Sequence, residues 1–150
     1  MASRCRTLIL GSMPSLVSLE EAFYYAHGRN AFWPILSEVF GTPCDTVEQK
    51  RACIVENDLA LWDVLQGCER RGSLDASIRA PQANDFSELF SAHPEIRKIL
   101  FNGATAWRLF ERFAGGFLEG RRAVRMPSTS PANTMTYAEK LALWRRELKL

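Results

Sequence analysis

Short apolar runs alternate along this chain with longer segments whose apolar residues recur every three or four positions. The apolar runs predict buried strands at residues 7–10, 59–65, 99–101 and 123–126. The helical spacing predicts amphipathic helices at 19–25, 31–40, about 45–57, around 86–90, around 107–113, and around 137–148. The polar stretch 67–85 predicts a long loop with at most one helical turn.

Several residues refine these boundaries. Gly41 predicts the end of the second helix, and Asp45 with Glu48 resembles a capping box that starts the third. In the last helix, we expect a core-facing stripe formed by Tyr137, Leu141, Trp144 and Leu148.

The alternation of strands and helices predicts an α/β fold with one parallel sheet covered by helices on both faces. With 150 residues and no linker, repeat or low-complexity segment, we expect a single domain over residues 1–150. Sites in such sheets form where loops leave the carboxyl ends of the strands. Three such loops are polar or rich in Gly and Pro: residues 11–15, 102–103 and 127–133.

Composition narrows the class of protein. At 47% hydrophobic and 24% charged residues, the chain resembles an ordinary soluble globular protein, and no apolar run is long enough for a membrane span or a signal peptide. We therefore expect a cytoplasmic protein that does not contact membranes. The net charge is only +2, but residues 121–150 carry +5, which fits either a phosphate-binding end or a solvated helix face.

The cysteines at 5, 44, 53 and 68 do not show metal-ligand spacing. None forms a C-x-x-C pair, and no pair of histidines accompanies them, so we expect no zinc site, no other metal and no cofactor. Their scattered spacing neither supports nor excludes an iron–sulfur cluster. Reduced thiols are expected in the cytoplasm.

The densest group of candidate functional residues lies at 24–33, where two tyrosines, a histidine, an arginine and Asn30 precede a helix. An aromatic ring such as Tyr25 can stack on a flipped base, and an asparagine can orient a water. The alternative for Asn30 is a helix cap, which is the commonest use of Asn at that place.

Two further loops offer polar groups. Asn102 can present a donor and an acceptor to a base edge, or it can serve as a turn residue before Gly103. The 127–133 loop, with Ser128, Thr129, Ser130 and Asn133, can bind phosphates or can be an ordinary connection to the last helix.

Four segments taken in order resemble the uracil-DNA glycosylase superfamily, and within it the hypoxanthine (deoxyinosine) DNA glycosylase branch. They are Leu-Ile-Leu-Gly-Ser-Met-Pro-Ser, Tyr-Tyr-Ala-His-Gly-Arg-Asn-Ala-Phe-Trp, Ile-Leu-Phe-Asn-Gly and Met-Pro-Ser-Thr-Ser-Pro-Ala-Asn. Segments 61–64 and 72–75 are similar to the same branch. The resemblance implies a three-layer α/β/α sandwich with a four-stranded parallel sheet.

The resemblance also assigns roles to residues. It places the catalytic water-positioning function on Asn30, because Met13 stands where other branches have Asp or Asn. It places Gly11, Ser12, Met13, Tyr25 and Asn102 at the base, and residues Ser128 to Ser130 in the minor-groove loop. The usual proline after the histidine is Gly28 here.

The function implied is hydrolytic removal of a deaminated base, hypoxanthine first, from damaged DNA by a monomer without cofactor. Lysines are scarce near the active edge, which disfavours a Schiff-base lyase. Four alternatives stay open: a uracil or xanthine glycosylase, a catalytically silent DNA-binding member, a nucleotide-binding metabolic protein, and an iron–sulfur relative.

Overall fold

The computed structural model describes residues 5–12, 25, 29–69 and 79–149. In order, these residues form β1 (Thr7–Gly11), α2 (Phe32–Phe40), α3 (Val47–Glu56), β2 (Leu59–Asp63), β3 (Leu65–Glu69), β4 (Arg79–Ala83), α4 (Phe86–Ala92), β5 (Lys98–Asn102), α5 (Ala104–Ala114), the 3-10 helix η2 (Gly115–Phe117), β6 (Arg122–Met126) and α6 (Tyr137–Leu148). No helix among these residues is long and apolar enough to cross a bilayer.

The main sheet has four strands in the order β2-β1-β5-β6, and every neighbouring pair is parallel. The four-stranded parallel sheet expected from the sequence is therefore confirmed. The two central strands are the most apolar, as expected for strands that are buried on both faces. Each crossover between neighbouring strands contains at least one helix.

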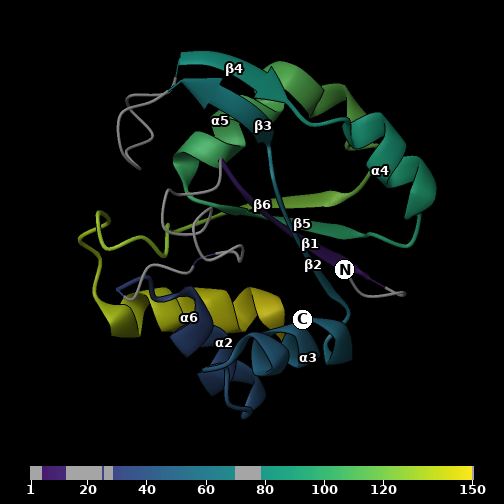
Figure 1. Ribbon diagram of the computed structural model, residues 1–150. Coiled ribbons are helices and arrows are strands. Elements are labelled where there is room, and N and C mark those ends of the chain that lie inside the picture. The colour runs from purple at the N-terminus through teal and green to yellow at the C-terminus, as the bar shows by residue number, and fades with distance from the viewer. Residues whose placement is uncertain (1–4, 13–24, 26–28, 70–78, 150) are drawn as a thin grey trace.

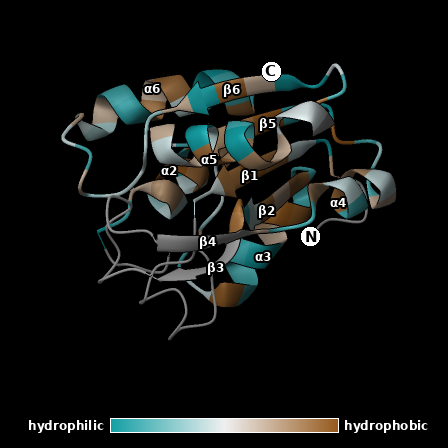
Figure 2. Cartoon of the chain, turned by 90° about the horizontal axis from the view of Figure 1, so that it is seen from above, coloured by the Kyte–Doolittle hydropathy of each residue, from teal (hydrophilic) through white to brown (hydrophobic). Residues whose placement is uncertain are grey.

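Successive side chains of the central strands point to opposite faces of the sheet and pack into two separate hydrophobic cores. On β1, Leu8 and Leu10 pack with α4 and α5, whereas Ile9 faces the opposite way and packs with α2, α3 and α6. Figure 1 shows the resulting layers, with α2, α3 and α6 on one face of the sheet and α4, α5 and the β3–β4 hairpin on the other. Figure 2 shows hydrophobic strands in the middle and helices of mixed character outside them. The three-layer α/β/α sandwich is confirmed.

The helix ends follow local chemistry. Gly41 caps α2 in the left-handed conformation with φ 66°, which confirms the predicted end. The predicted capping box at Asp45 and Glu48 is wrong by one residue. Thr46 is the N-cap, its hydroxyl accepts from the Gln49 amide, and the Gln49 side chain returns to the Thr46 amide.

The long loop expected at 67–85 is also wrong in part. Residues 65–69 and 79–83 pair as the antiparallel strands β3 and β4, with register irregularities at Gly67. Residues 70–78, and with them the 72–75 segment, lie outside the described residues. The polar sequence of these two strands lacks the alternating apolar pattern that predicts a strand. The Asn84 side chain and backbone amide donate to the carbonyls of Asp63 and Val64, which connects the hairpin to the end of β2.

The core stripe of α6 differs from the expected one. Trp144 is fully buried and Leu141 and Leu148 pack beside it, but Tyr137 is exposed. Lys140 and Glu147, two charged residues, are buried instead. Both have polar partners in the tertiary structure, which helical spacing alone does not reveal. Most of the helix expected at 19–25 lies outside the described residues, and Tyr25 at its end lies in a turn.

Candidate active site at the carboxyl edge of the sheet

The ends of the four parallel strands place four residues at one edge of the sheet. Asp63, Gly11, Asn102 and Met126 are the last residues of β2, β1, β5 and β6, and they follow one another across the sheet in that order. The Cα of Gly11 is paired in register with that of Asp63, and Asn102 with Met126. The segments that the sequence singled out therefore begin side by side.

The loop after β1 starts from a fixed backbone. Gly11 and Ser12 are both buried, and their carbonyls accept hydrogen bonds from the amides of Val64 (2.8 Å) and Leu65 (2.9 Å). These two bonds join the first loop to the connection between β2 and β3. Met13, which was expected to contact the base, lies outside the described residues.

Gly11 is a glycine because two polar side chains lie over its Cα. A methyl group there would stand 2.7 Å from Asp63 Oδ1 and 3.2 Å from the Tyr25 hydroxyl. Asp63 is only 4% exposed, so a carboxylate is buried at the candidate site. Asp63 was not among the residues predicted for the site, although an Asp that ends an apolar strand was the available signal.

Tyr25 is held against the start of α2. Its backbone is left-handed, with φ 55°, a conformation that costs energy in a residue with a side chain. Its ring centroid lies 4.2 Å from that of Phe32, and Phe32 in turn contacts Trp33 and Trp144 edge-on. The aromatic ring expected to stack on a base therefore rests on the buried aromatic core.

The capping alternative for Asn30 is wrong by one residue, because Ala31 is the N-cap of α2, without a side-chain cap bond, and Asn30 lies just before it. Its Oδ1 accepts a hydrogen bond of 2.9 Å from the Phe32 amide in the first turn of α2. Because that partner is a donor, the oxygen of the Asn30 amide must face it, and the orientation of the side chain is fixed. Among the described residues, Nδ2 and the second lone pair of Oδ1 remain for a water or a substrate. The turn-forming bond and a water-positioning role are therefore compatible.

Thr129 joins three segments that are distant in the sequence. Its side-chain hydroxyl accepts from Asn102 Nδ2, and its amide donates to Asn102 Oδ1, both at 2.9 Å. Its carbonyl accepts from the Ala31 amide at 2.9 Å, next to Asn30. Thr129 is 1% exposed, so its hydroxyl serves this internal connection and does not face solvent. Asn102, expected to read a base, has its amide oriented by Thr129.

Side chains of α6 hold the 127–133 loop in place through hydrogen bonds to its carbonyls. Lys140 Nζ donates to the carbonyls of Ser130 (3.1 Å) and Asn133 (3.0 Å), and Trp144 Nε1 donates to the carbonyl of Pro127 (3.0 Å). Lys140 is 4% exposed, and its burial lowers the pKa of its ammonium group. This role of Lys140 was not predicted, because a lysine in a basic segment is expected to be a solvated or phosphate-binding charge.

Within this loop the side chains form local turns. Ser128 Oγ accepts from the Ser130 amide, Ser130 Oγ from the Ala132 amide, and Asn133 Oδ1 from the Met135 amide. Ser128, Ser130 and Asn133 are each half-buried, so they present part of their surface to solvent. Gly103 has φ 100° and lies against the Ser128 side chain, which fixes the start of the loop.

Tyr25 and Asn30 line a groove with a volume of about 790 Å³. It continues along the outer side of α2 to the α2–α3 connection. Its other lining residues are Trp33, Pro34, Ser37, Glu38, Gly41, Cys44, Asp45, Lys50 and Tyr137. Tyr25 and Asn30 thus lie in a groove that is open to solvent and can hold an extended ligand.

The basic end of the chain is largely paired within the protein. Arg122 and Arg145 form ion pairs with Glu147 (3.0 Å) and Glu38 (3.5 Å). Arg121 donates to the carbonyl of Ile96, and Lys140 is buried as described. Of the exposed remainder, Arg125 lies one residue before the end of β6 and so belongs to the candidate edge.

Comparison with known proteins agrees with this arrangement. A family model described as the uracil DNA glycosylase superfamily matches residues 2–149. A hypoxanthine DNA glycosylase of Methanosarcina acetivorans is 34% identical over 139 residues, 91% of this chain and 86% of that protein. One of Methanosarcina barkeri is 35% identical over 98 residues, 64% of this chain and 62% of that protein.

A solved structure supports the same assignment. The solution NMR structure of a candidate uracil DNA glycosylase from Methanosarcina acetivorans is similar to this protein with a TM-score of 0.82 and 32% sequence identity. The similarity covers 100% of this chain and 94% of that chain. The fold, the order of the motifs and the family match all point the same way, and the chain belongs to the uracil DNA glycosylase superfamily.

Proposed function

We propose that this protein is a monofunctional DNA glycosylase that removes a deaminated base, hypoxanthine first, from damaged DNA. The relatives named hypoxanthine DNA glycosylase support the choice of base. The observation that carries the proposal is the fixed placement of Asn30. Its oxygen accepts from the Phe32 amide at the start of α2, and the adjacent Ala31 amide is bonded to Thr129, so one network holds Asn30, Asn102 and the 127–133 loop together.

The reaction begins with extrusion of the damaged nucleotide, which costs a few kcal/mol and less for a mispaired base. The base stacks on Tyr25 while Asn30 holds a water near the sugar. As the glycosidic bond breaks, the sugar acquires oxocarbenium character and the leaving base becomes negative. Backbone amides at the carboxyl edge stabilise that negative charge. Asn30 is a poor base and orients the water, which attacks a strong electrophile.

The buried Asp63 carboxylate suits recognition of a deaminated base. Deamination converts N1 of adenine from an acceptor into the N1–H donor of hypoxanthine, and N3 of cytosine into the N3–H of uracil. A carboxylate accepts such a hydrogen and repels the lone pair of the intact base. Asp63 and Asn102 end strands that are two positions apart, about 10 Å across the sheet. That spacing admits a base between them.

The partner in this proposal is damaged duplex or single-stranded DNA, bound by a monomer. Ser128, Ser130 and Asn133 would contact the backbone beside the lesion, while Thr129 supports them from inside. Met13, Gly11 and Ser12 would border the base from the β1 side. The product would be an abasic site.

The test is cleavage of labelled oligonucleotides that carry one deoxyinosine, deoxyuridine or deoxyxanthosine, with alkali added to break abasic sites. We expect breaks at deoxyinosine with the wild type and their loss with Asn30→Ala. Breaks mainly at deoxyuridine or deoxyxanthosine would retain the class of reaction and overturn the choice of base.

The second candidate is a silent DNA-binding member of the same fold, which the partly exposed polar side chains of the supported 127–133 loop would also suit. It predicts retained DNA affinity with no breaks at any of the three lesions. Binding of oligonucleotides by wild type and Asn30→Ala, measured by fluorescence anisotropy, therefore separates a turnover defect from a binding defect.

A further inference from the structure

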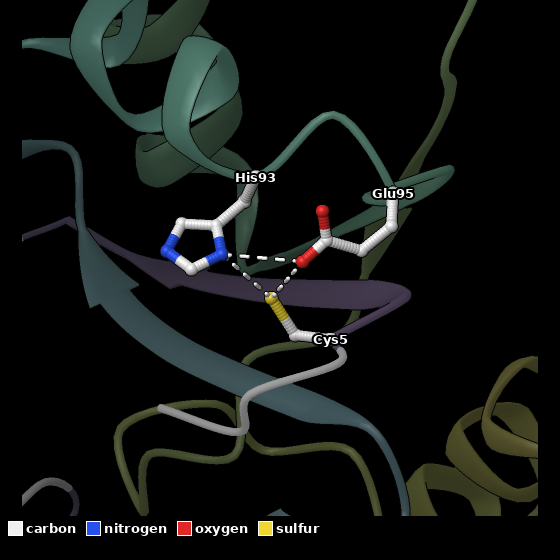
Figure 3. A group of neighbouring side chains, drawn as sticks. All are labelled: Cys5, His93 and Glu95. Carbon is white, nitrogen blue, oxygen red and sulfur yellow. Dashed lines mark hydrogen bonds and ion pairs between the residues drawn. The ribbon is translucent and has the colours of Figure 1, made fainter.

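A second cluster of reactive side chains lies at the amino edge of the sheet, opposite the candidate active site. Cys5 stands two residues before β1, and His93 and Glu95 lie in the connection between α4 and β5. Figure 3 shows the three side chains pointing toward one another. Cys5 Sγ lies 3.8 Å from His93 Nδ1 and 3.8 Å from Glu95 Oε1, and those two atoms are 3.2 Å apart.

These separations match the edges of a tetrahedral zinc site. Zinc binds Cys S at about 2.3 Å and His N or carboxylate O at about 2.0–2.2 Å. At tetrahedral angles, the ligand atoms then lie about 3.3 Å apart for N and O and about 3.6 Å apart for pairs that include sulfur. We propose that Cys5, His93 and Glu95 form a zinc-binding site at the amino edge of the sheet.

The chemistry of the three donors selects among metals. A thiolate and an imidazole do not suit Mg²⁺ or Ca²⁺, which take oxygen ligands. A single thiolate does not hold an iron–sulfur cluster, which needs about four. A mixed set of S, N and O ligands suits Zn²⁺. Cys5 and His93 are 88 residues apart, so no spacing in the sequence indicates that they meet.

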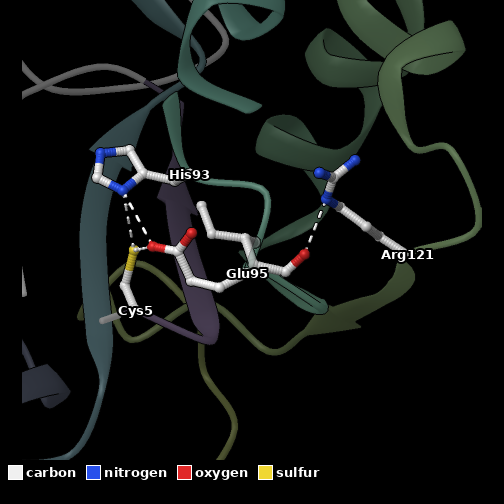
Figure 4. Close-up of polar contacts among 5 residues, drawn as sticks. Cys5, His93, Glu95 and Arg121 are labelled. Carbon is white, nitrogen blue, oxygen red and sulfur yellow. Dashed lines mark hydrogen bonds and ion pairs between the residues drawn. The ribbon is translucent and has the colours of Figure 1, made fainter. Parts of the chain in front are cut away.

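The backbone around the cluster is already rigid. The Arg6 carbonyl accepts from the amides of both Arg97 (2.9 Å) and Lys98 (3.2 Å), which ties the start of β1 to the α4–β5 connection. Arg121 Nε donates to the carbonyl of Ile96 at 2.9 Å, next to Glu95 (Figure 4). Its guanidinium also lies over the ring of Phe90. Ligands held by such a scaffold lose little freedom on binding a cation.

The cluster is open to a cation from solvent. Cys5 is buried, but the side chains of His93 and Glu95 are 27% and 31% exposed, which leaves the fourth position to a water. In the metal-free state, the Cys5 thiol donates its hydrogen to Glu95. Binding of Zn²⁺ forms the sulfur–zinc bond and releases that proton to solvent, with no change of oxidation state.

The experiment is titration of the metal-free, full-length chain under reducing conditions with Co²⁺ and then Zn²⁺. We expect a thiolate-to-cobalt absorption band in the near ultraviolet that Zn²⁺ abolishes, and a rise in Tm on the order of 5 °C at saturating Zn²⁺. Cys5→Ser and Glu95→Gln should lose the Tm rise, and Cys5→Ser should also lose the band. Glu95→Gln, at a partly exposed position, remains informative if Cys5→Ser does not fold.

Cys53→Ala is the matched control, because it removes a buried thiol from α3 on the other face of the sheet. It should retain both signals. A wild type without band or Tm rise would reduce the cluster to a hydrogen-bonded group and overturn the proposal. A band that persists in Cys5→Ser would overturn it by placing the metal elsewhere. Neither measurement uses DNA, so its outcome is independent of the proposed function.

Discussion

At the scale of single residues, Asn30 carries two separable contributions. Asn30→Ala removes the acceptor of the Phe32 amide and should cost about 0.5–2 kcal/mol of stability in addition to activity. Asn30→Ser keeps a side-chain oxygen that can form the same local turn and removes the carboxamide. We expect Asn30→Ser to unfold in urea close to the wild type and still to lose most glycosylase turnover. Retained turnover would leave Asn30 with the turn-forming role alone.

A substitution at Asp63 tests whether its carboxylate recognises the N1–H edge of the deaminated base. Asp63→Asn replaces a charged acceptor by a neutral amide, which should lower kcat/KM for deoxyinosine about 10- to 100-fold while cleavage at deoxyadenosine does not fall in proportion. The ratio of the two rates is the informative measurement, because a general structural defect lowers both. Asp58→Asn, just before the other end of β2, is the control and should leave the ratio unchanged.

Cys44 gives the molecule a pH dependence in the alkaline range. Burial raises the pKa of its thiol from 9.0 to about 12, so between these values the unfolded chain loses a proton that the folded chain keeps. Stability must therefore fall as pH rises from 9.0 toward 12. The difference in unfolding free energy between wild type and Cys44→Ala, measured in urea with reductant, should shrink across this window. A constant difference would contradict the raised pKa.

At the scale of elements, α6 acts as the support of the 127–133 loop. Lys140→Met keeps the buried chain length but removes the donor to the carbonyls of Ser130 and Asn133. We expect a loss of about 1–3 kcal/mol in stability and a higher KM for lesion-containing DNA, because two carbonyls lose their partner and the loop loosens. Chemical denaturation and steady-state kinetics measure the two effects.

Lys149→Met is the control for Lys140→Met. It removes a lysine from the exposed end of the same helix, where the ammonium lies over Phe40 and not over the loop. It should leave KM unchanged and alter the free energy of unfolding by no more than about 0.5 kcal/mol. An unchanged KM in Lys140→Met would show that the hydrogen bonds of Lys140 to the loop do not contribute to DNA binding.

At the scale of the whole molecule, exposed and internally paired arginines lie at opposite ends of β6. Arg125 lies near the candidate edge, whereas Arg122, at the other end of β6, is paired with Glu147. Arg125→Ala should reduce the slope of log affinity against log salt by about 0.9, the value for one phosphate contact. Arg122→Ala should leave the slope unchanged and lower stability. Equal slopes in both variants would place the DNA elsewhere.

The sequence by itself determined the α/β class, the four strands of the parallel sheet and the segments of the candidate site. Apolar periodicity and strand-end polar residues are local signals, and burial on both faces of a parallel sheet imposes them. The end of α2 at Gly41 was predictable for the same reason, since it depends on neighbouring backbone groups. The start of α2 was not, because Ala31 takes the N-cap position without a side-chain bond.

Only the tertiary structure decided which distant groups meet. The connection through Thr129 and the approach of Asp63 to Gly11 join residues far apart in the chain. The β3–β4 hairpin and the hydrogen bonds of Lys140 join nearer segments, but no periodic pattern in the sequence marks them. The Cys5, His93 and Glu95 cluster belongs with them. The sequence does not indicate which partner a buried polar residue will have, because the packing of strands and helices determines that partner and spacing along the chain does not.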